Sequence, residues 1–217
     1  MQPRLIHFIS GLGIDERAFS KLVLPEGYEM RSVRWIEPEK NEPFPSYCRR
    51  LLAQIDTSQP LILAGLSLGG MVSVELNKIV PVERTILISS IPSRDEMPKW
   101  YRLLIVLGIH RLIPATLLKR TNPLTYWVFG IRTKEERRLL KAIMADMSAK
   151  FLVWALKEAA FWKNETVPGN IVRIHGTKDR VLYFPKRRKV DFPVKGAGHF
   201  MVFTHPEEVN AALREIL

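Results

Sequence analysis

A serine flanked by glycines lies where an apolar run changes into a helical pattern. The segment Gly65-Leu66-Ser67-Leu68-Gly69 follows the run LILA and precedes apolar residues at helical spacing. A sharp strand-to-helix turn needs glycines two residues to each side of the serine, because side chains there would collide with neighbouring backbone. The turn would present the Ser67 hydroxyl at the positive end of the following helix. We therefore predict that Ser67 is a nucleophile supported by Gly65 and Gly69; the alternative is a glycine-rich turn with an inert serine.

An acid and a histidine follow this serine along the chain. Asp179 ends the segment HGTKD, directly after the apolar run IVRI, and His199 lies twenty residues later in the segment GAGHF. Serine, acid, histidine is the chain order expected for a nucleophile on such a turn. Catalytic groups of open parallel sheets collect at the carboxyl ends of the strands, so both side chains could reach Ser67. We predict that His199 accepts the serine proton and that Asp179 orients the imidazole and stabilises its cation.

Other acids could take the place of Asp179. Asp191 is one rival, and the pair Asp95 and Glu96 is another, because the acid can also follow the strand after the nucleophile turn. Asp179 could instead bond to local backbone as a turn residue, and His199 could be a buried histidine at a strand end. The position of Asp179 in its loop favours it over the rival acids.

A second glycine-containing loop is the expected site for the anion that forms during acyl transfer. The segment Ser10-Gly11-Leu12-Gly13 follows the first apolar run of the chain. Backbone N–H groups of such a loop, and of the residue after the nucleophile, stabilise the tetrahedral intermediate in serine hydrolases. We predict an oxyanion hole formed by the N–H groups of Leu12 and Leu68, with Gly11 and Gly13 letting the loop fold close to the substrate. The alternative is an ordinary strand-to-helix turn.

Short apolar runs alternate with helical patterns, which indicates a parallel sheet flanked by helices. Strands are predicted over residues 5–10, 30–36, 61–64, 85–89, 171–175 and 189–194, and helices over 45–55 and 70–79. Pro193 places the sixth strand at an edge or a strand end. A last helix is expected to start at a capping box formed by Thr204 and Glu207. The expected fold is α/β, with a mostly parallel open sheet of about six strands.

The interval from about residue 97 to residue 162 interrupts this alternation. It contains helical patterns and no convincing strand, and we interpret it as a helical cap inserted in a single domain that spans residues 1–217. Gly130 is expected to separate two of its helices, the second starting near Thr133 with Glu135 and Glu136 in its first turn. Because the inner face of a cap lines the pocket, we expect this one to select the substrate without supplying triad chemistry.

Four segments together resemble the α/β-hydrolase superfamily: SGLG after the first strand, GLSLGG at the serine turn, HGTKD, and GAGHF before a helix that opens with proline. The resemblance covers the core at both ends of the chain. It implies a serine hydrolase with a nucleophile elbow, a catalytic triad and an oxyanion hole, on an eight-stranded sheet shortened here to about six strands. Ser10 departs from the family pattern, which often has a histidine before the glycine, so the subfamily stays open.

The composition limits the other classes of function. A chain of 217 residues with 47% hydrophobic and 25% charged residues is expected to fold as one globular domain. The single cysteine, Cys48, excludes an internal disulfide and a cysteine-rich zinc site, and its helical pattern favours packing over reactivity. The N-terminus has no signal-peptide pattern, and charged residues and a proline interrupt the apolar stretch 100–118. We therefore expect a cytoplasmic protein with no membrane-spanning helix.

The formal net charge of +11 would suit a nucleic acid or an anionic membrane surface. No nucleic-acid motif accompanies the charge, so nucleic acid is not an expected partner, whereas a membrane surface stays an alternative. No cofactor and no metal are expected, and the sequence does not decide the oligomeric state. We conclude that the chain hydrolyses an ester, thioester or amide bond of a small, partly apolar substrate through an acyl-enzyme on Ser67. The alternative is a non-catalytic binding protein of the same fold.

Overall fold

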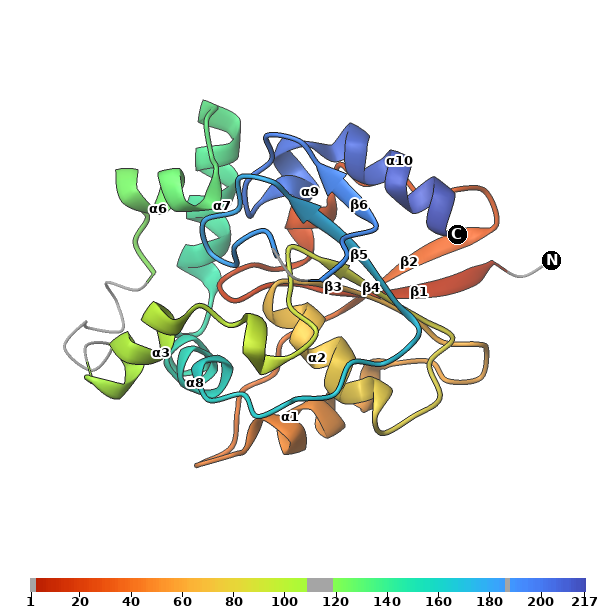
Figure 1. The fold of residues 1–217 in the computed structure, drawn as a ribbon, viewed down its shortest axis with the longest axis horizontal. Helices are drawn as coiled ribbons and strands as arrows, with labels where there is room; N and C mark the ends of the chain where they lie inside the picture. The colour runs from red at the N-terminus through yellow and green to blue at the C-terminus, as the bar shows by residue number, and fades with distance from the viewer. Residues whose placement is uncertain (1–2, 109–118, 186–187) are drawn as a thin grey trace.

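One six-stranded sheet forms the centre of the molecule (Figure 1). The computed structural model describes residues 3–108, 119–185 and 188–217. The strand order is β2-β1-β3-β4-β5-β6, and every neighbouring pair is parallel, which confirms the predicted open α/β sheet. The strands are β1 (Arg4–Ile9), β2 (Tyr28–Val33), β3 (Ile62–Leu66), β4 (Arg84–Ile88), β5 (Ile171–Gly176) and β6 (Phe192–Val194). Because all of them run the same way, their carboxyl ends share one edge of the sheet.

Helices cover both faces of this sheet (Figure 1). On one face lie α1 (Phe44–Leu51), α2 (Leu68–Asn77) and α8 (Ala149–Ala160); on the other lie α7 (Lys134–Asp146), α9 (Met201–Thr204) and α10 (Pro206–Ile216). Successive side chains of a strand point to opposite faces, so β3 places Leu63 in one apolar cluster and Ile62 and Ala64 in the other. Among the described helices, none is long and apolar enough to cross a membrane.

Between β4 and β5 the chain forms α3 (Lys99–Val106), α6 (Pro123–Phe129), α7 and α8, with no strand among the described residues of this interval. Residues 109–118 of the predicted cap lie outside the described part. Gly130 ends α6 with a φ of 78°, and Thr133 caps α7 through a capping box with Glu136. Both helix boundaries predicted here are confirmed.

Two sequence predictions at the C-terminal end were wrong in detail. Thr204 does not cap α10, because residues 201–204 themselves form α9 and His205 precedes α10 without a side-chain capping bond. The Thr204 hydroxyl bonds instead to the Phe200 carbonyl and to the His205 ring. The sixth strand is also shorter than predicted: β6 comprises only three residues at the sheet edge, with Pro193 in its centre.

The turn from β3 into α2 is packed against the end of β1. Ser67 occupies this turn with φ 52° and ψ −115°, a strained conformation for a residue with a side chain. A Cβ atom on Gly69 would overlap the carbonyl oxygens of Ile9 and Ser10, and one on Gly65 would overlap the backbone of Gly69. The two glycines are therefore required by direct backbone-to-backbone contact.

We expect Gly69→Ala to lower the free energy of unfolding by about 3 kcal/mol, because the added methyl group can only be accommodated by moving α2 away from β1. Urea unfolding followed by circular dichroism measures this change. Gly169→Ala is the matched control, since a Cβ atom there has no neighbour within 4 Å and its φ is not positive. Equal stability of the two variants would contradict the close approach of α2 to β1.

Candidate functional site

The Ser67 hydroxyl lies at the carboxyl edge of the sheet, at the N-terminus of α2. The Ser67 N–H donates to the carbonyl of Ile88 at the end of β4 (3.0 Å), and its carbonyl accepts a bond from the Ser90 hydroxyl (2.6 Å). These bonds hold the strained turn from both sides. The positive end of α2 lies directly behind the hydroxyl and favours negative charge at this position.

His199 and Asp179 lie beside this serine, on the loops that follow β6 and β5. The distance from Ser67 Oγ to His199 Nε2 is 2.9 Å, and the distance from His199 Nδ1 to Asp179 Oδ2 is 2.8 Å. Asp179 can only accept in this pair, so Nδ1 carries the proton and Nε2 is free to accept from the serine. All three residues are buried, with exposed fractions of 8% or less. The structure thus places Ser67, His199 and Asp179 in one hydrogen-bonded series.

The Asp179 carboxylate is held on both of its oxygens. Oδ1 accepts the N–H groups of Val181 (2.8 Å) and Leu182 (3.0 Å), while Oδ2 faces His199. His175 Nε2 lies 3.4 Å from Oδ2 and donates to the Leu182 carbonyl at 2.8 Å. Burial lowers the pKa of His175, which disfavours the cationic form of this imidazole. Its contact with Asp179 was not anticipated, although His175 opens the same HGTKD segment.

The rival acids lie in other interactions. Both oxygens of Glu96 pair with the buried guanidinium of Arg173, and Asp95 pairs with Arg188. Asp191 accepts the N–H of Arg173 and forms an ion pair with Lys189. Among the described residues, Asp179 is the acid that bonds to His199.

The loop after β1 lies against the serine turn, so Leu12 of this loop and Leu68 at the start of α2 both border the pocket at Ser67. A Cβ atom on Gly11 would lie 3.2 Å from Ser67 Cβ, which shows how closely this loop approaches the nucleophile turn. Gly13 adopts a φ of 70°, which a residue with a side chain rarely takes. The N–H groups of Leu12 and Leu68 have no hydrogen-bond partner among the described residues. Both are therefore available to an oxygen atom next to Ser67.

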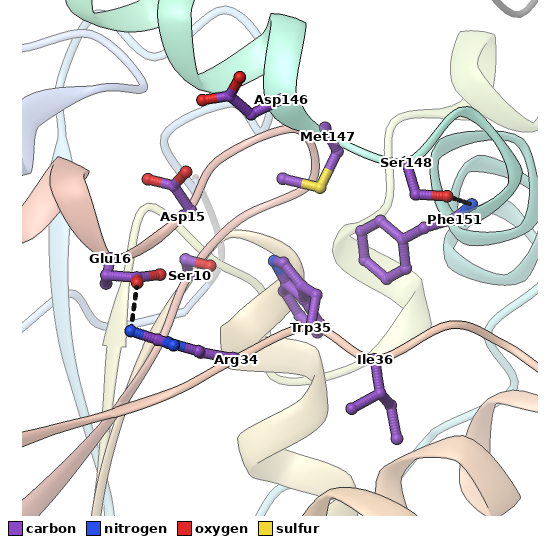
Figure 2. A pocket seen from close by; sticks show the side chains of 10 residues that line it. All are labelled: Ser10, Asp15, Glu16, Arg34, Trp35, Ile36, Asp146, Met147, Ser148 and Phe151. Atoms are coloured by element: carbon purple, nitrogen blue, oxygen red, sulfur yellow. Dashed lines mark hydrogen bonds and ion pairs between the residues drawn. The ribbon is translucent and has the colours of Figure 1, made fainter.

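Trp35, which the sequence did not single out, lines a pocket together with Ser10 and Phe151 (Figure 2) and bonds to this loop. Its indole N–H donates to the carbonyls of Ile14 (3.1 Å) and Gly11 (3.3 Å), and the Ser10 hydroxyl also donates to Ile14 (2.8 Å). The ring of Phe151 lies 4.9 Å from the Trp35 ring, on the border of a pocket of about 300 Å³. No local pattern could have revealed this contact, because Trp35 follows a different strand.

Ser67 and His199 open onto an apolar pocket of about 210 Å³. Its other walls come from Leu12, Leu68, Met71, Met97, Pro98, Trp100, Tyr101, Val128, Phe129, Leu156, Ala159, Val181 and Leu182. Several of these belong to α3, α6 and α8, between β4 and β5. The pocket can therefore take an apolar group with its reacting end at Ser67.

Cys48 is a core residue and does not line the pocket at Ser67. Cys48 is fully buried on α1 in the core, and burial raises the pKa of its thiol, so the reactive thiolate is disfavoured. In residues 3–108, 119–185 and 188–217, no group of three or more His, Cys, Asp or Glu side chains is placed to hold a metal ion.

Solved structures with the same fold include several enzymes. MenH from S. aureus has a TM-score of 0.74 at 16% identity, over 100% of this chain and 94% of that chain. A thermophilic esterase from Thermogutta terrifontis has a TM-score of 0.67 at 14% identity, over 99% and 89%. A hydrolase from Pseudomonas aeruginosa PA01 has a TM-score of 0.61 at 15% identity, over 99% and 89%. The TM-scores show a shared fold, and at these identities they show the fold alone.

The sequence itself is matched by a family model. No curated protein matches the chain in sequence. The model described as the alpha/beta hydrolase family matches residues 29–212, a range that includes the serine turn and the loops that carry Asp179 and His199. This chain belongs to the alpha/beta hydrolase family.

Proposed function

We propose that this chain is a serine hydrolase that cleaves an ester, thioester or amide bond of a small, partly apolar substrate. The observation that carries the proposal is the bonded series from Asp179 through His199 to Ser67 Oγ, which ends at an apolar pocket. An esterase and a hydrolase among the proteins of similar fold are in keeping with this chemistry.

In the proposed reaction, Ser67 Oγ attacks the carbonyl carbon while His199 Nε2 takes the serine proton. The carbonyl oxygen becomes an oxyanion, and the cationic imidazole is stabilised by the Asp179 carboxylate. The proton on Nε2 then passes to the leaving alcohol, thiol or amine, and the acyl group remains on Ser67. Water repeats the sequence with the acyl-enzyme, which releases the acid and restores the serine.

The proposed oxyanion hole consists of the Leu12 and Leu68 N–H groups. Neither N–H group has a hydrogen-bond partner among the described residues, and both residues line the pocket at Ser67, which supports this role. Removing one donor of such a site typically slows catalysis by about 10²–10³-fold. Gly11 and Gly13 let the loop approach this position, and Trp35 holds the carbonyl of Gly11.

We further propose that the helices between β4 and β5 act as the cap that selects the substrate. Three of these helices give the pocket apolar surface: α8 through Leu156 and Ala159, α3 through Trp100 and Tyr101, and α6 through Val128. Such surface binds an acyl chain and excludes water, which separates substrates by a few kcal/mol at most. We also propose a cytoplasmic location, since the single cysteine suits a reducing compartment.

Ser67→Ala is expected to abolish covalent labelling by a fluorophosphonate and to lower kcat for a 4-nitrophenyl ester by about 10⁴-fold or more, because no nucleophile remains. Fluorescent gel analysis and esterase kinetics over a series of acyl lengths measure both effects. Undiminished turnover would remove Ser67 from the mechanism. Labelling that persists in Ser67→Ala but disappears in Cys48→Ala would move the nucleophile to the cysteine.

Asp179→Asn is expected to lower kcat by about 10³-fold, because an amide can donate to Nδ1 and thereby stabilise the wrong imidazole tautomer. Asp191→Asn and Asp95→Asn serve as matched controls, since their carboxylates bond to Arg173, Lys189 and Arg188 and not to His199. Steady-state kinetics gives kcat for the three variants and shows which acid supports His199. A larger loss in either control would assign the acid to that position.

Trp35→Phe is expected to lower kcat about tenfold, because the loop that carries the Leu12 N–H loses the indole bonds to Gly11 and Ile14. Trp154→Phe is the matched control: Trp154 packs on Phe151 as Trp35 does, but its indole N–H donates to the carbonyl of Glu42 and not to this loop. Each variant should lose about 1 kcal/mol in unfolding free energy. An equal kcat for the two variants would show that Trp35 has only a structural role.

A further inference from the structure

A single peptide unit joins the nucleophile to one donor of the proposed oxyanion hole. The carbonyl of Ser67 and the N–H of Leu68 belong to this unit, which is planar and trans, so the two groups point in opposite directions. The Leu68 N–H has no hydrogen-bond partner among the described residues, and Leu68 lines the pocket at Ser67. Any contact that fixes the direction of the Ser67 carbonyl therefore also fixes the direction of the Leu68 N–H.

Three donors bond to the Ser67 carbonyl. The N–H groups of Gly70 (3.0 Å) and Met71 (3.4 Å) belong to the first turn of α2 and move with it. The third donor, the Ser90 hydroxyl, belongs to a separate element, because Ser90 lies two residues after the end of β4. Its bond to the carbonyl is the shortest of the three at 2.6 Å. The Ser90 bond thus ties this peptide unit to the sheet.

The backbone and the side chain of Ser90 are both held by their neighbours. Ser90 is fully buried, and a Cβ atom on Gly70 would overlap its Oγ, so the hydroxyl packs directly against α2. The Ser90 carbonyl accepts a bond from Arg173 Nη2 at 3.3 Å, and both oxygens of Glu96 bond to the same guanidinium. The hydroxyl therefore has little room to turn away from the Ser67 carbonyl.

We propose that Ser90 is a positioning residue, whose hydroxyl holds the peptide unit between Ser67 and Leu68 so that the Leu68 N–H points at the oxyanion. This inference rests on the proposed serine hydrolase function. Ser90 does not line the pocket at Ser67, so it acts through the peptide unit and not on the substrate. Without the hydroxyl, the strained Ser67 backbone can relax by tilting this unit. The tilt misaligns a donor that is needed in the transition state.

Ser90→Ala tests this role. The Ser67 carbonyl keeps its bond from the Gly70 N–H, so we expect the variant to fold. We expect kcat for a 4-nitrophenyl ester to fall about tenfold, less than the about 10²–10³-fold of a removed donor, because this donor is only displaced. KM should not change, since the oxyanion forms only in the transition state. Titration of the reactive sites with a fluorophosphonate keeps any loss of folded protein out of kcat.

Ser89→Ala is the matched control. It removes the same hydroxyl from the neighbouring and equally buried position, where Ser89 Oγ has no hydrogen-bond partner in the described structure. Its kcat should equal that of the native chain. Equal kcat values for the two variants would overturn the proposal. A rise in KM with unchanged kcat in Ser90→Ala would overturn it as well, because the hydroxyl would then shape the pocket.

Two inhibitors report on the oxyanion itself. Octyl trifluoromethyl ketone adds to a catalytic serine and leaves a negatively charged oxygen, whereas octyl methyl ketone binds as a neutral carbonyl compound. In Ser90→Ala the inhibition constant of the trifluoromethyl ketone should rise about tenfold, and that of the methyl ketone should not change. Equal weakening of both inhibitors would show that Ser90 has only a structural role.

The behaviour of the native chain separates this inference from the hydrolase proposal. A native chain that hydrolyses the ester, with equal kcat in the two variants, overturns the positioning role alone. A native chain that neither hydrolyses the ester nor reacts with the fluorophosphonate overturns the hydrolase proposal, and amide exchange followed by NMR then tests the hold of Ser90 on the turn. Faster exchange of the Gly70 N–H in Ser90→Ala than in Ser89→Ala would support that hold, and equal exchange would overturn it.

Discussion

The backbone contact between the first turn of α2 and the end of β1 is the constraint on which the site depends. It is tolerated only because Gly69 has no side chain to meet the carbonyls of Ile9 and Ser10. The contact brings the loop after β1 against Ser67, so Leu12, Ser67 and Leu68 line the same pocket. The strained backbone of Ser67, which costs about 1–3 kcal/mol, is offset by its bonds to Ile88 and Ser90.

The hydrogen-bonded residues Ser67, His199 and Asp179 are buried, and the pocket beside Ser67 and His199 is lined mainly by apolar side chains. The Asp179 side chain lies inside the protein, where a polar group is tolerated only when hydrogen-bonded. Two backbone N–H groups and the His199 ring supply those bonds, and the His175 ring packs beside them. The carboxylate is therefore rigid, which in turn holds the imidazole in one orientation toward Ser67.

Several features of the fold could be predicted because they depend on local chemistry. The succession of short apolar runs and helical patterns located all six strands. Gly130 and Thr133 marked two helix boundaries, where the structure shows a positive φ and a capping box. The same local signal failed at Thr204, where the residues just before it form a short helix of their own. A capping pattern is a preference of a few residues, and packing of Met201, Val202 and Phe203 into the core overrides it.

The sequence by itself determined the class of sheet, the strained serine turn and the chain order of serine, acid and histidine, because each depends on residues close together in the chain or on their succession. Only the tertiary structure decided which acid meets His199. Glu96 bonds to the guanidinium of Arg173 and Asp191 accepts the N–H of Arg173, and no spacing in the sequence indicates either contact. The structure alone also brought the Trp35 indole to the carbonyl of Gly11. Contacts between residues far apart in the chain depend on how the layers pack, and a linear pattern does not carry that information.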